Sequence, residues 1–127
     1  MTVTFTFNAP AARLSLNDRR HWANKARIAK DWRDTTAIIA GNHAILSKLP
    51  KPLGPSNVHV EFVVGTHRRR DADNAMATLK PMVDGLVDAG WFTDDDSRTV
   101  RHSVGFTVDK AHAGQVRVTV TPWEQAA

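Results

Sequence analysis

Residues Val58–Gly90 have the sequence VHVEFVVGTHRRRDADNAMATLKPMVDGLVDAG, and this stretch decides the fold. From Val58 to Val64 apolar and polar side chains alternate, which is the period of a half-buried strand. From about Asn74 to Ala89 the apolar residues recur at helical spacing, which predicts an amphipathic helix with Gly90 just past its end. Pro81 removes one backbone hydrogen bond, so the pattern predicts a kink there or a new helix that begins at Pro81.

A longer helix is predicted upstream, from Asp18 to about Ala40, because apolar residues recur there at helical spacing. Trp22 and Trp32 belong to this stripe and are expected in the core. The residues expected to bound the helix are Asn17 or Asp18 as its N-cap and Gly41 with Asn42 at its end. The proline-rich stretch that follows is expected to be an ordered connector rather than a domain boundary.

Alternation of apolar and polar residues predicts three more strands, at residues 2–7, 100–108 and 116–120, with Ala113 and Gly114 in the turn between the last two. Because every strand alternates, one face of the sheet should be covered and the other should be polar or covered by a partner. The expected fold is one α+β domain over residues 1–127. It has a four-stranded mixed sheet with two helices packed on one face, in the order βαβαββ, and a frayed tail at 122–127.

The composition fits a single small domain with an anionic partner. The chain has 127 residues, 42% of them hydrophobic, which is long enough for one core and short for two. Its formal net charge of +4 favours a partner such as nucleic acid. There is no cysteine, so disulfides and thiolate metal sites are excluded. The N-terminal stretch MTVTFTFNAP resembles neither a signal peptide nor a membrane span, so a cytoplasmic protein without a membrane partner is expected.

Aspartates are concentrated in one part of this basic chain. Asp71 and Asp73 flank a single residue at the junction of strand and helix, and their oxygen atoms suit Mg²⁺ or Mn²⁺ better than zinc. At about 100° per residue, Asp73, Lys80 and Asp84 share a helix face away from the apolar stripe. The loop after the helix offers a third carboxylate from among residues 94–96. A cation held there would support phosphodiester hydrolysis, with Lys80 offsetting the charge that develops.

Each of these features also has a purely structural interpretation. An Asp-x-Asp-Asn segment before a helix often caps it, and a run of aspartates is often a solvated turn. Lys80 and Asp84 can form a surface ion pair, and a run of arginines is usually solvated. The spacing of the six histidines matches no set of metal ligands. Trp91 and Phe92 are expected to anchor the loop after the helix rather than to stack on bases.

In combination, these motifs resemble the RusA family of Holliday junction resolvases. The order is a strand, an Arg-rich turn, Asp-x-Asp-Asn, a helical lysine, a helical aspartate, Ala-Gly with two aromatic residues, and then two aspartates. The resemblance is specific over Arg68–Asp95. The stretch LSLNDRRHW, Leu14–Trp22, is also similar to the family's start, so the resemblance extends over most of the chain.

The resemblance implies roles for the site residues. Asp71, Asp73 and Asp95 would bind Mg²⁺, for which Mn²⁺ can substitute, with Asp94 or Asp96 as alternative third ligands. Lys80 would be the catalytic lysine, and Asn74 and Asp84 would assist. The lysine stands further from the Asp-x-Asp pair than in the family, and Pro81 follows it directly. The alternative is that its role is unfilled or shared with a neighbouring arginine.

The resemblance also implies a homodimer that nicks two opposing strands of a four-way junction or other branched DNA, without a small-molecule cofactor. Such an enzyme would act in DNA recombination and repair, in a bacterial cell or a host infected by phage, since phages often carry members of the family. The residues expected to hold backbone phosphates are Arg19, Arg20, Arg27, Lys30, Arg68, Arg69 and Arg70. The alternatives are a catalytically silent DNA-binding relative and a small metal-binding interaction module.

Overall fold

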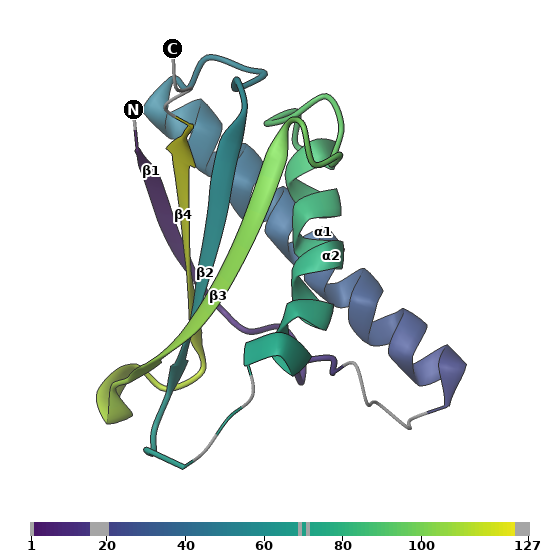
Figure 1. Cartoon of the computed structure of the whole chain (residues 1–127), viewed down its shortest axis with the longest axis vertical. Helices are drawn as coiled ribbons and strands as arrows, with labels where there is room; N and C mark the ends of the chain where they lie inside the picture. Colours follow the sequence, from purple (N-terminus) through teal and green to yellow (C-terminus); the bar gives the residue numbers. More distant parts are fainter. Residues whose placement is uncertain (1, 16–20, 69, 71, 124–127) are drawn as a thin grey trace.

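The computed structural model describes residues 2–15, 21–68, 70 and 72–123, without the side chains of residues 72–74. Its elements are β1 (Val3–Asn8), α1 (Trp22–Ser47), β2 (Ser56–Val64), α2 (Ala72–Asp88), β3 (Val100–Val108), the short 3-10 helix η1 (Lys110–His112) and β4 (Gln115–Pro122). The four strands form one mixed sheet, and both helices lie on one face of it (Figure 1). The predicted fold class and the order βαβαββ are therefore confirmed.

The strands lie in the order β1-β4-β2-β3. β4 is antiparallel to both of its neighbours, whereas β2 and β3 are parallel and α2 is the crossover between them. β3 and β4 follow each other in sequence but are not neighbours, because their connection passes the end of β2. There the backbone N–H groups of Asp109 and Gly114 donate to the carbonyls of Val64 and Val63, at 2.8 and 2.9 Å.

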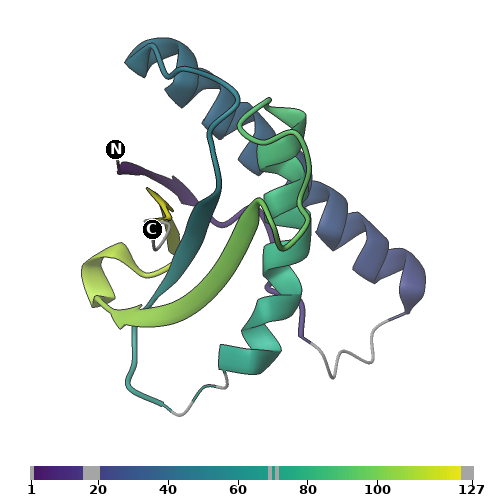
Figure 2. The ribbon, with the colours of Figure 1, turned by 45° about the horizontal axis from the view of Figure 1, so that its top comes forward.

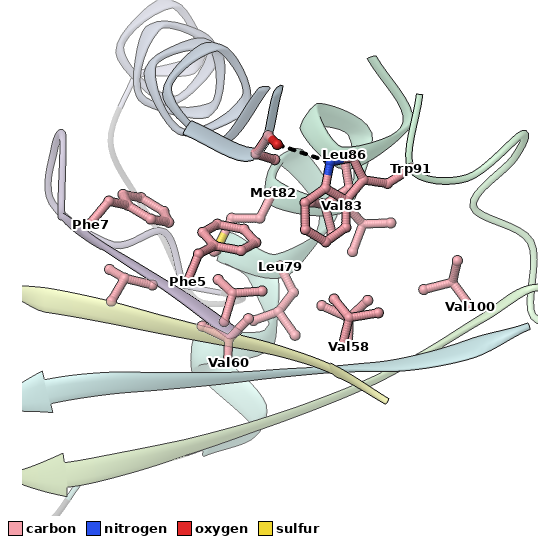
Figure 3. Packing of buried hydrophobic residues seen from close by; sticks show 14 of the residues in the cluster. Phe5, Phe7, Val58, Val60, Leu79, Met82, Val83, Leu86, Trp91 and Val100 are labelled. Atoms are coloured by element: carbon pink, nitrogen blue, oxygen red, sulfur yellow. Dashed lines mark hydrogen bonds between the residues drawn. The ribbon is translucent and has the colours of Figure 1, made fainter. Parts of the chain in front are cut away.

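Seen from another direction, both helices again lie on one side of the sheet (Figure 2). The core fills the space between the sheet and the helices (Figure 3). Phe5 and Phe7 of β1 reach it from alternate positions of that strand, as the pattern predicts. Trp32 is fully buried, and its indole N–H donates to the carbonyl of Ala12 at 3.0 Å. The expectation for Trp22 is wrong, since its side chain is 72% exposed. The reason is that Trp22 is the first residue of α1, and burial in that helix begins only at Trp32.

α1 begins later than the sequence predicts. The expected N-caps, Asn17 and Asp18, lie outside the described residues. His21 caps the helix instead, and its Nδ1 accepts a hydrogen bond from the backbone N–H of Ala23 at 3.2 Å. A histidine is not among the usual capping residues, so its position in the sequence carries no start signal.

α1 also ends later, because the predicted stop at Gly41 and Asn42 does not occur. The helix continues to Ser47, and Lys48 follows in the left-handed conformation with φ 53°. Ala44, one turn beyond Gly41, is buried against the core. Packing of these last turns therefore outweighs the penalty of roughly 1 kcal/mol that a glycine brings to a helix interior.

α2 is continuous through Pro81, so the alternative in which a new helix begins there is excluded. Its end agrees with the prediction. Gly90 has φ 82°, and its N–H donates to the carbonyl of Val87 at 2.9 Å. The next N–H, of Trp91, donates to the carbonyl of Leu86 at 3.0 Å. This pair of bonds satisfies the last carbonyls of the helix and turns the chain into residues 91–99, here named the acidic loop.

The two helices contact each other closely at Gly85. A Cβ atom at this position would lie 2.5 Å from the backbone oxygen of Arg33 and 3.0 Å from the Cβ of Thr36. Glycine therefore allows α1 and α2 to lie side by side, and it brings side chains of α1 within reach of the acidic face of α2.

The face of the sheet opposite the helices is polar. Thr4 and Thr119 lie 3.4 Å apart there, and Nδ1 of His59 lies 2.6 Å from the hydroxyl of Ser103. The polar outer face matches the prediction from alternation. Within the described part of the chain, neither helix is both long and apolar enough to cross a membrane.

The predicted fraying of residues 122–127 is wrong for its first two residues. Pro122 is the last residue of β4, where it pairs with Ser56. The backbone N–H of Trp123 donates to the carbonyl of Pro55 at 3.0 Å, and the guanidinium of Arg101 lies 4.0 Å from the centre of the Trp123 ring. These contacts hold Pro122 and Trp123 against the start of β2 and the connector before it. Residues 124–127 lie outside the described part.

Candidate active site

Lys80 lies at the centre of the candidate site, on the solvent side of α2. Its Nζ donates to Oδ1 of Asp84 at 3.0 Å, one turn further along the helix, and to Oδ2 of Asp95 in the acidic loop. The Lys80 side chain is 67% exposed, whereas those of Asp84 and Asp95 are 25% and 28% exposed. One ammonium group therefore holds two partly buried carboxylates close together.

These contacts shift the titration of both partners. The hydrogen bond to Asp95, and next the bond to Asp84, raises the pKa of Lys80. The same hydrogen bond from Lys80 lowers the pKa of Asp95. At neutral pH the pair is therefore a cation and an anion.

The three consecutive aspartates have different surroundings. Asp94 accepts a hydrogen bond through Oδ1 from the backbone N–H of Asp95, at 2.7 Å. Asp96 accepts from the backbone N–H and the guanidinium of Arg98, at 2.8 and 3.0 Å, so its carboxylate is engaged within the loop. Asp95 is the one of the three that contacts Lys80. Asp95 therefore lies with Lys80 and Asp84, and Asp94 is its neighbour in the loop.

Trp91 and Phe92 anchor the acidic loop, as predicted. Their side chains are 0% and 2% exposed. The indole N–H of Trp91 donates to the backbone oxygen of Ala40 in α1 at 3.1 Å (Figure 3). The backbone oxygen of Trp91 accepts a hydrogen bond from the N–H of Leu53 at 2.7 Å. The loop that carries Asp95 therefore starts from a point fixed to both α1 and the connector before β2.

Arg33 of α1 joins this cluster, although the sequence did not single it out. Its guanidinium donates to both oxygens of Asp88, at 2.7 and 2.9 Å, and lies 4.0 Å from Oδ2 of Asp84. The bidentate pair raises the pKa of Arg33 and lowers that of Asp88. Arg33 and Asp88 are 55 positions apart in sequence. Their pairing depends on the close contact of α1 and α2 at Gly85, so no local spacing predicts it.

His102 of β3 is a second neighbour that the sequence did not identify. Partial burial lowers its pKa, while Asp95 raises it and Lys80 lowers it, so both groups act on the imidazole. The net shift is downward, although the His102 side chain is exposed to solvent. The scattered spacing of the histidines gave no signal of this position.

Part of the predicted ligand set lies outside the described residues. Asp71 is one such residue, and Asp73 and Asn74 are placed only through their backbone, in the first turn of α2. Asp73 precedes Lys80 on a continuous helix, which separates their backbones by about 10.5 Å along its axis. Arg19, Arg20 and Arg69 also lie outside the described part.

The donors at the site are carboxylate oxygens, which suit Mg²⁺ or Mn²⁺ better than zinc. Among the side chains that the structure describes, no group of three or more histidines and acids is arranged to hold a metal ion. Lys80 pairs with both Asp84 and Asp95, so one positive charge offsets half of their combined negative charge. A cation that binds Asp95 therefore has to compete with this ammonium group.

The residues expected to hold phosphates differ in their contacts. Arg27 is exposed on α1 and donates to Oδ1 of Asn24 at 3.0 Å. Lys30 forms an ion pair with Asp34. Arg68 is exposed, as expected of a solvated run. Arg70 is less exposed. Its guanidinium donates hydrogen bonds to the carbonyls of Thr66 and Arg68, at 2.7 and 3.0 Å.

Comparison with known proteins identifies a relative but no described family. No protein-family model matches the chain. An uncharacterized protein of Xylella fastidiosa (strain Temecula1 / ATCC 700964) is 34% identical over 125 residues, which cover 98% of this chain and 79% of that protein. The similarity therefore extends over the sheet, both helices and the acidic loop. The chain belongs to the same family as this Xylella fastidiosa protein.

Proposed function

We propose that the protein is a Mg²⁺-dependent endonuclease that cuts four-way junctions and related branched DNA, in the manner of the RusA family. The observation that carries the proposal is the contact between Lys80 and Asp95. These residues come from separate motifs of the segment that resembles the family. A surface ion pair within one helix explains Lys80 with Asp84, but it does not explain why the acid after the two aromatic residues meets the same lysine.

Each residue has a proposed task. Asp71, Asp73 and Asp95, with Asp94 as the alternative, would hold a Mg²⁺ or Mn²⁺ ion, which when bound polarises a phosphoryl oxygen and lowers the pKa of a water molecule. Lys80 donates a hydrogen bond to a phosphate or leaving oxygen as negative charge develops there. Asp84 also accepts a hydrogen bond from Lys80, so it would still hold the ammonium group if a bound cation took Asp95 from it.

The acids form two groups along α2. Asp73 lies in the first turn of α2, and Asp84 and Asp95 surround Lys80 about two turns later, while Asp71 precedes the helix in sequence. Either one ion joins the two groups, or each group binds its own ion. The number of Mn²⁺ ions bound per chain distinguishes these arrangements, and loss of one ion in Asp95→Asn alone would assign the second group.

The proposal includes a homodimer with one site per subunit. A two-fold dimer presents two identical sites to a junction of matching symmetry, which yields paired nicks in opposing strands. Exposed basic residues, among them Arg27 and Arg68, would contact backbone phosphates, so affinity should fall steeply as salt rises. The proposed setting is DNA recombination or repair in the cytoplasm of a bacterial or phage-infected cell.

The test is a cleavage assay on a synthetic four-way junction and a linear duplex, with Mg²⁺, Mn²⁺, Ca²⁺ or a chelator. Paired nicks in the junction alone, lost in Asp73→Asn and Asp95→Asn while DNA binding remains, support the proposal. Asp31→Asn is the matched control, because Asp31 is an exposed acid of α1. Cleavage that survives Asp73→Asn overturns the assignment of the site.

A catalytically silent DNA-binding relative is the second candidate. The unbroken course of α2 favours it, because no bulge shortens the distance from Asp73 to Lys80 and Pro81 follows the lysine directly. Junction binding without cleavage under every metal would establish this candidate. Metal binding without DNA affinity at low salt would exclude both and leave a metal-binding interaction module.

A further inference from the structure

The guanidinium group of Arg33 contacts two aspartates of α2 that are one turn apart. Its Nε and Nη2 donate to Asp88 at 2.7 and 2.9 Å, and its Nη1 lies 4.0 Å from Oδ2 of Asp84. One carboxylate thus engages two of the three nitrogens, and the third nitrogen faces the other carboxylate. Arg33 belongs to α1, so these contacts cross from one helix to the other (Figure 1).

The Arg33 side chain is held at both of its ends. A Cβ atom at Gly85, the residue after Asp84, would lie 2.5 Å from the backbone oxygen of Arg33, so the backbone there is in close contact with α2. At the other end, the bidentate pair with Asp88 fixes the plane of the guanidinium group. The nitrogen that faces Asp84 is therefore kept in place by packing and by hydrogen bonds.

Asp84 faces a cation with each of its oxygens. Oδ1 accepts a hydrogen bond from Nζ of Lys80 at 3.0 Å, and Oδ2 faces Nη1 of Arg33. The Asp84 side chain is partly buried, which limits the screening of these charges by solvent. The carboxylate therefore has a preferred orientation, in which Oδ1 is directed at Lys80.

The orientation of Asp84 matters because the other carboxylate that holds Lys80 belongs to the proposed metal site. Nζ of Lys80 also donates to Oδ2 of Asp95. If a bound cation takes Asp95, only Asp84 remains of the two carboxylates that hold the ammonium group. Lys80 then keeps its place only as firmly as Asp84 itself is held.

We infer that Arg33 is a positioning residue, which orients the ammonium group of Lys80 through Asp84. The inference rests on the proposed function for the part that Lys80 takes in cleavage, but the arrangement of the side chains can be tested without DNA or metal. The alternative is that Arg33 and Asp88 only hold the two helices together. The two interpretations differ at Lys80, because a contact that only joins the helices would leave the ammonium group unaffected.

The first measurement follows the mobility of the Lys80 ammonium group by ¹⁵N relaxation, in chelator and in the Asp95→Asn background. In that background Asp84 has to hold the ammonium group without Asp95. Arg33→Met should lower the order parameter of this group toward that of Lys110, an exposed lysine of η1. Arg33→Lys keeps the charge and should restore most of the lost order.

The matched control is Arg117→Met. Arg117 also forms an ion pair with an aspartate, Asp109, at 3.7 Å, but its side chain alternates with the buried side chains of β4 and so points away from the helices. Its replacement removes the same charge as Arg33→Met. The order parameter of the Lys80 ammonium group and the kcat of cleavage should both stay unchanged in this control.

The second measurement is the rate of junction cleavage at saturating Mg²⁺. Arg33→Met should lower kcat about tenfold and leave KM within about twofold, since a small displacement of Lys80 affects the reaction and not the binding of DNA. Asp84→Asn should have a similar effect. The double variant should be slower than Asp84→Asn by no more than about twofold, because both changes act through one side chain. Arg33→Lys should lie within about threefold of the wild type.

Unchanged mobility of the ammonium group in Arg33→Met overturns the inference, and so does an equal change in Arg117→Met. Losses of kcat that multiply in the double variant overturn it as well, because Arg33 would then act independently of Asp84. A loss confined to KM would show that Arg33 binds the DNA itself, which also overturns it.

If Arg33→Met does not fold, the relaxation measurement is made on Asp88→Asn. This change releases the guanidinium group to compete with Lys80 for Asp84, so the mobility of the ammonium group should rise, and unchanged mobility overturns the inference. If the wild type does not cut DNA, the proposed function fails by itself. The relaxation measurement then decides the inference alone.

Discussion

The ammonium group of Lys80, in the middle of α2, contacts the carboxylate of Asp95, which lies in the loop after that helix. The contact joins two motifs that the sequence separates by the second half of α2 and its closing turn. Asp84 meets the same ammonium group at 3.0 Å, so the three side chains form one charged cluster. A cation that binds Asp95 in the proposed reaction therefore either shares its carboxylate with the Lys80 ammonium group or displaces that group.

Lys80→Met should separate metal binding from catalysis. Because Lys80 competes for Asp95 and repels cations, its removal should leave Mn²⁺ affinity unchanged or higher. Junction cleavage should fall by about 10² to 10³, the loss typical of a donor that stabilises developing charge. Isothermal titration with Mn²⁺ and the nicking assay measure the two effects. A variant that loses Mn²⁺ binding would show that Lys80 supports the ion rather than the reaction.

The titration of Asp95 should report the same contact. Its pKa lies below the ordinary 3.8 because Lys80 donates to it, so Lys80→Met should raise that pKa. The stabilisation from Asp95 is present above its unfolded pKa and is lost as pH falls through the folded pKa. That from Lys80, whose pKa is raised above 10.5, is lost only as pH rises through the raised value.

Between about pH 6 and 8 both contributions are complete. Since Lys80 is largely exposed, Lys80→Met should lower the free energy of unfolding there by only about 0.2 to 1 kcal/mol. The difference should shrink below the ordinary pKa of Asp95. Carbon-detected NMR of the Asp95 carboxyl group, with urea unfolding at several pH values, measures both effects. An Asp95 pKa that does not move would mean that the contact is absent in solution.

The elements could be predicted where the pattern is local. Alternation in β1 and β2 and the helical period of α2 depend on neighbouring residues only, and the positive φ of Gly90 follows from the absence of a side chain. Trp22 and Gly41 were mispredicted for a shared reason. Whether a helix residue is buried, or a glycine tolerated, depends on how far the helix extends past the sheet, which no local pattern contains.

The residues of the candidate site, too, could be predicted only in part. The resemblance singles out Lys80 and Asp95, and the structure describes them in contact. Arg33 and His102 could not be found, because their partners lie far away in sequence and are reached only through helix packing and strand register. A fold of two helices on a mixed sheet brings such residues together without any spacing rule.

Gly85→Ala should destabilise the protein, whereas Gly41→Ala should stabilise it. Both glycines lie within helices, where alanine is preferred by about 0.5 to 1 kcal/mol. A Cβ at Gly85 would lie 2.5 Å from the backbone oxygen of Arg33, while a Cβ at Gly41 meets nothing within 4 Å. Overpacking at Gly85 should outweigh the helix preference and lower the free energy of unfolding by roughly 1 to 3 kcal/mol.

Urea unfolding of both glycine variants measures the difference. Gly85→Ala should also disturb the pairing of Arg33 with Asp88, because the helices must move apart at that contact. Equal stability of the two variants would show that α1 and α2 are not in close contact at Gly85.

Trp91→Phe should destabilise the protein and loosen the acidic loop. The indole N–H of Trp91 donates to the backbone oxygen of Ala40 in a fully buried setting, and phenylalanine removes that donor and leaves space unfilled. The expected loss in free energy of unfolding is about 1 to 3 kcal/mol. Trp22→Phe is the matched control: Trp22 is 72% exposed, so its replacement should change stability by less than about 0.5 kcal/mol.

The same variant tests whether the anchor positions Asp95. Hydrogen exchange of backbone amides in residues 94–100 should quicken in Trp91→Phe and remain unchanged in Trp22→Phe, since the loop begins at Trp91. The N–H groups of Thr99 and Val100, which both donate to the carbonyl of Asp96 at 2.9 Å, are the most direct reporters. Junction cleavage should fall along with loop protection, because Asp95 then meets Lys80 for a smaller fraction of the time. Faster exchange without loss of cleavage would mean that Asp95 does not need the Trp91 anchor.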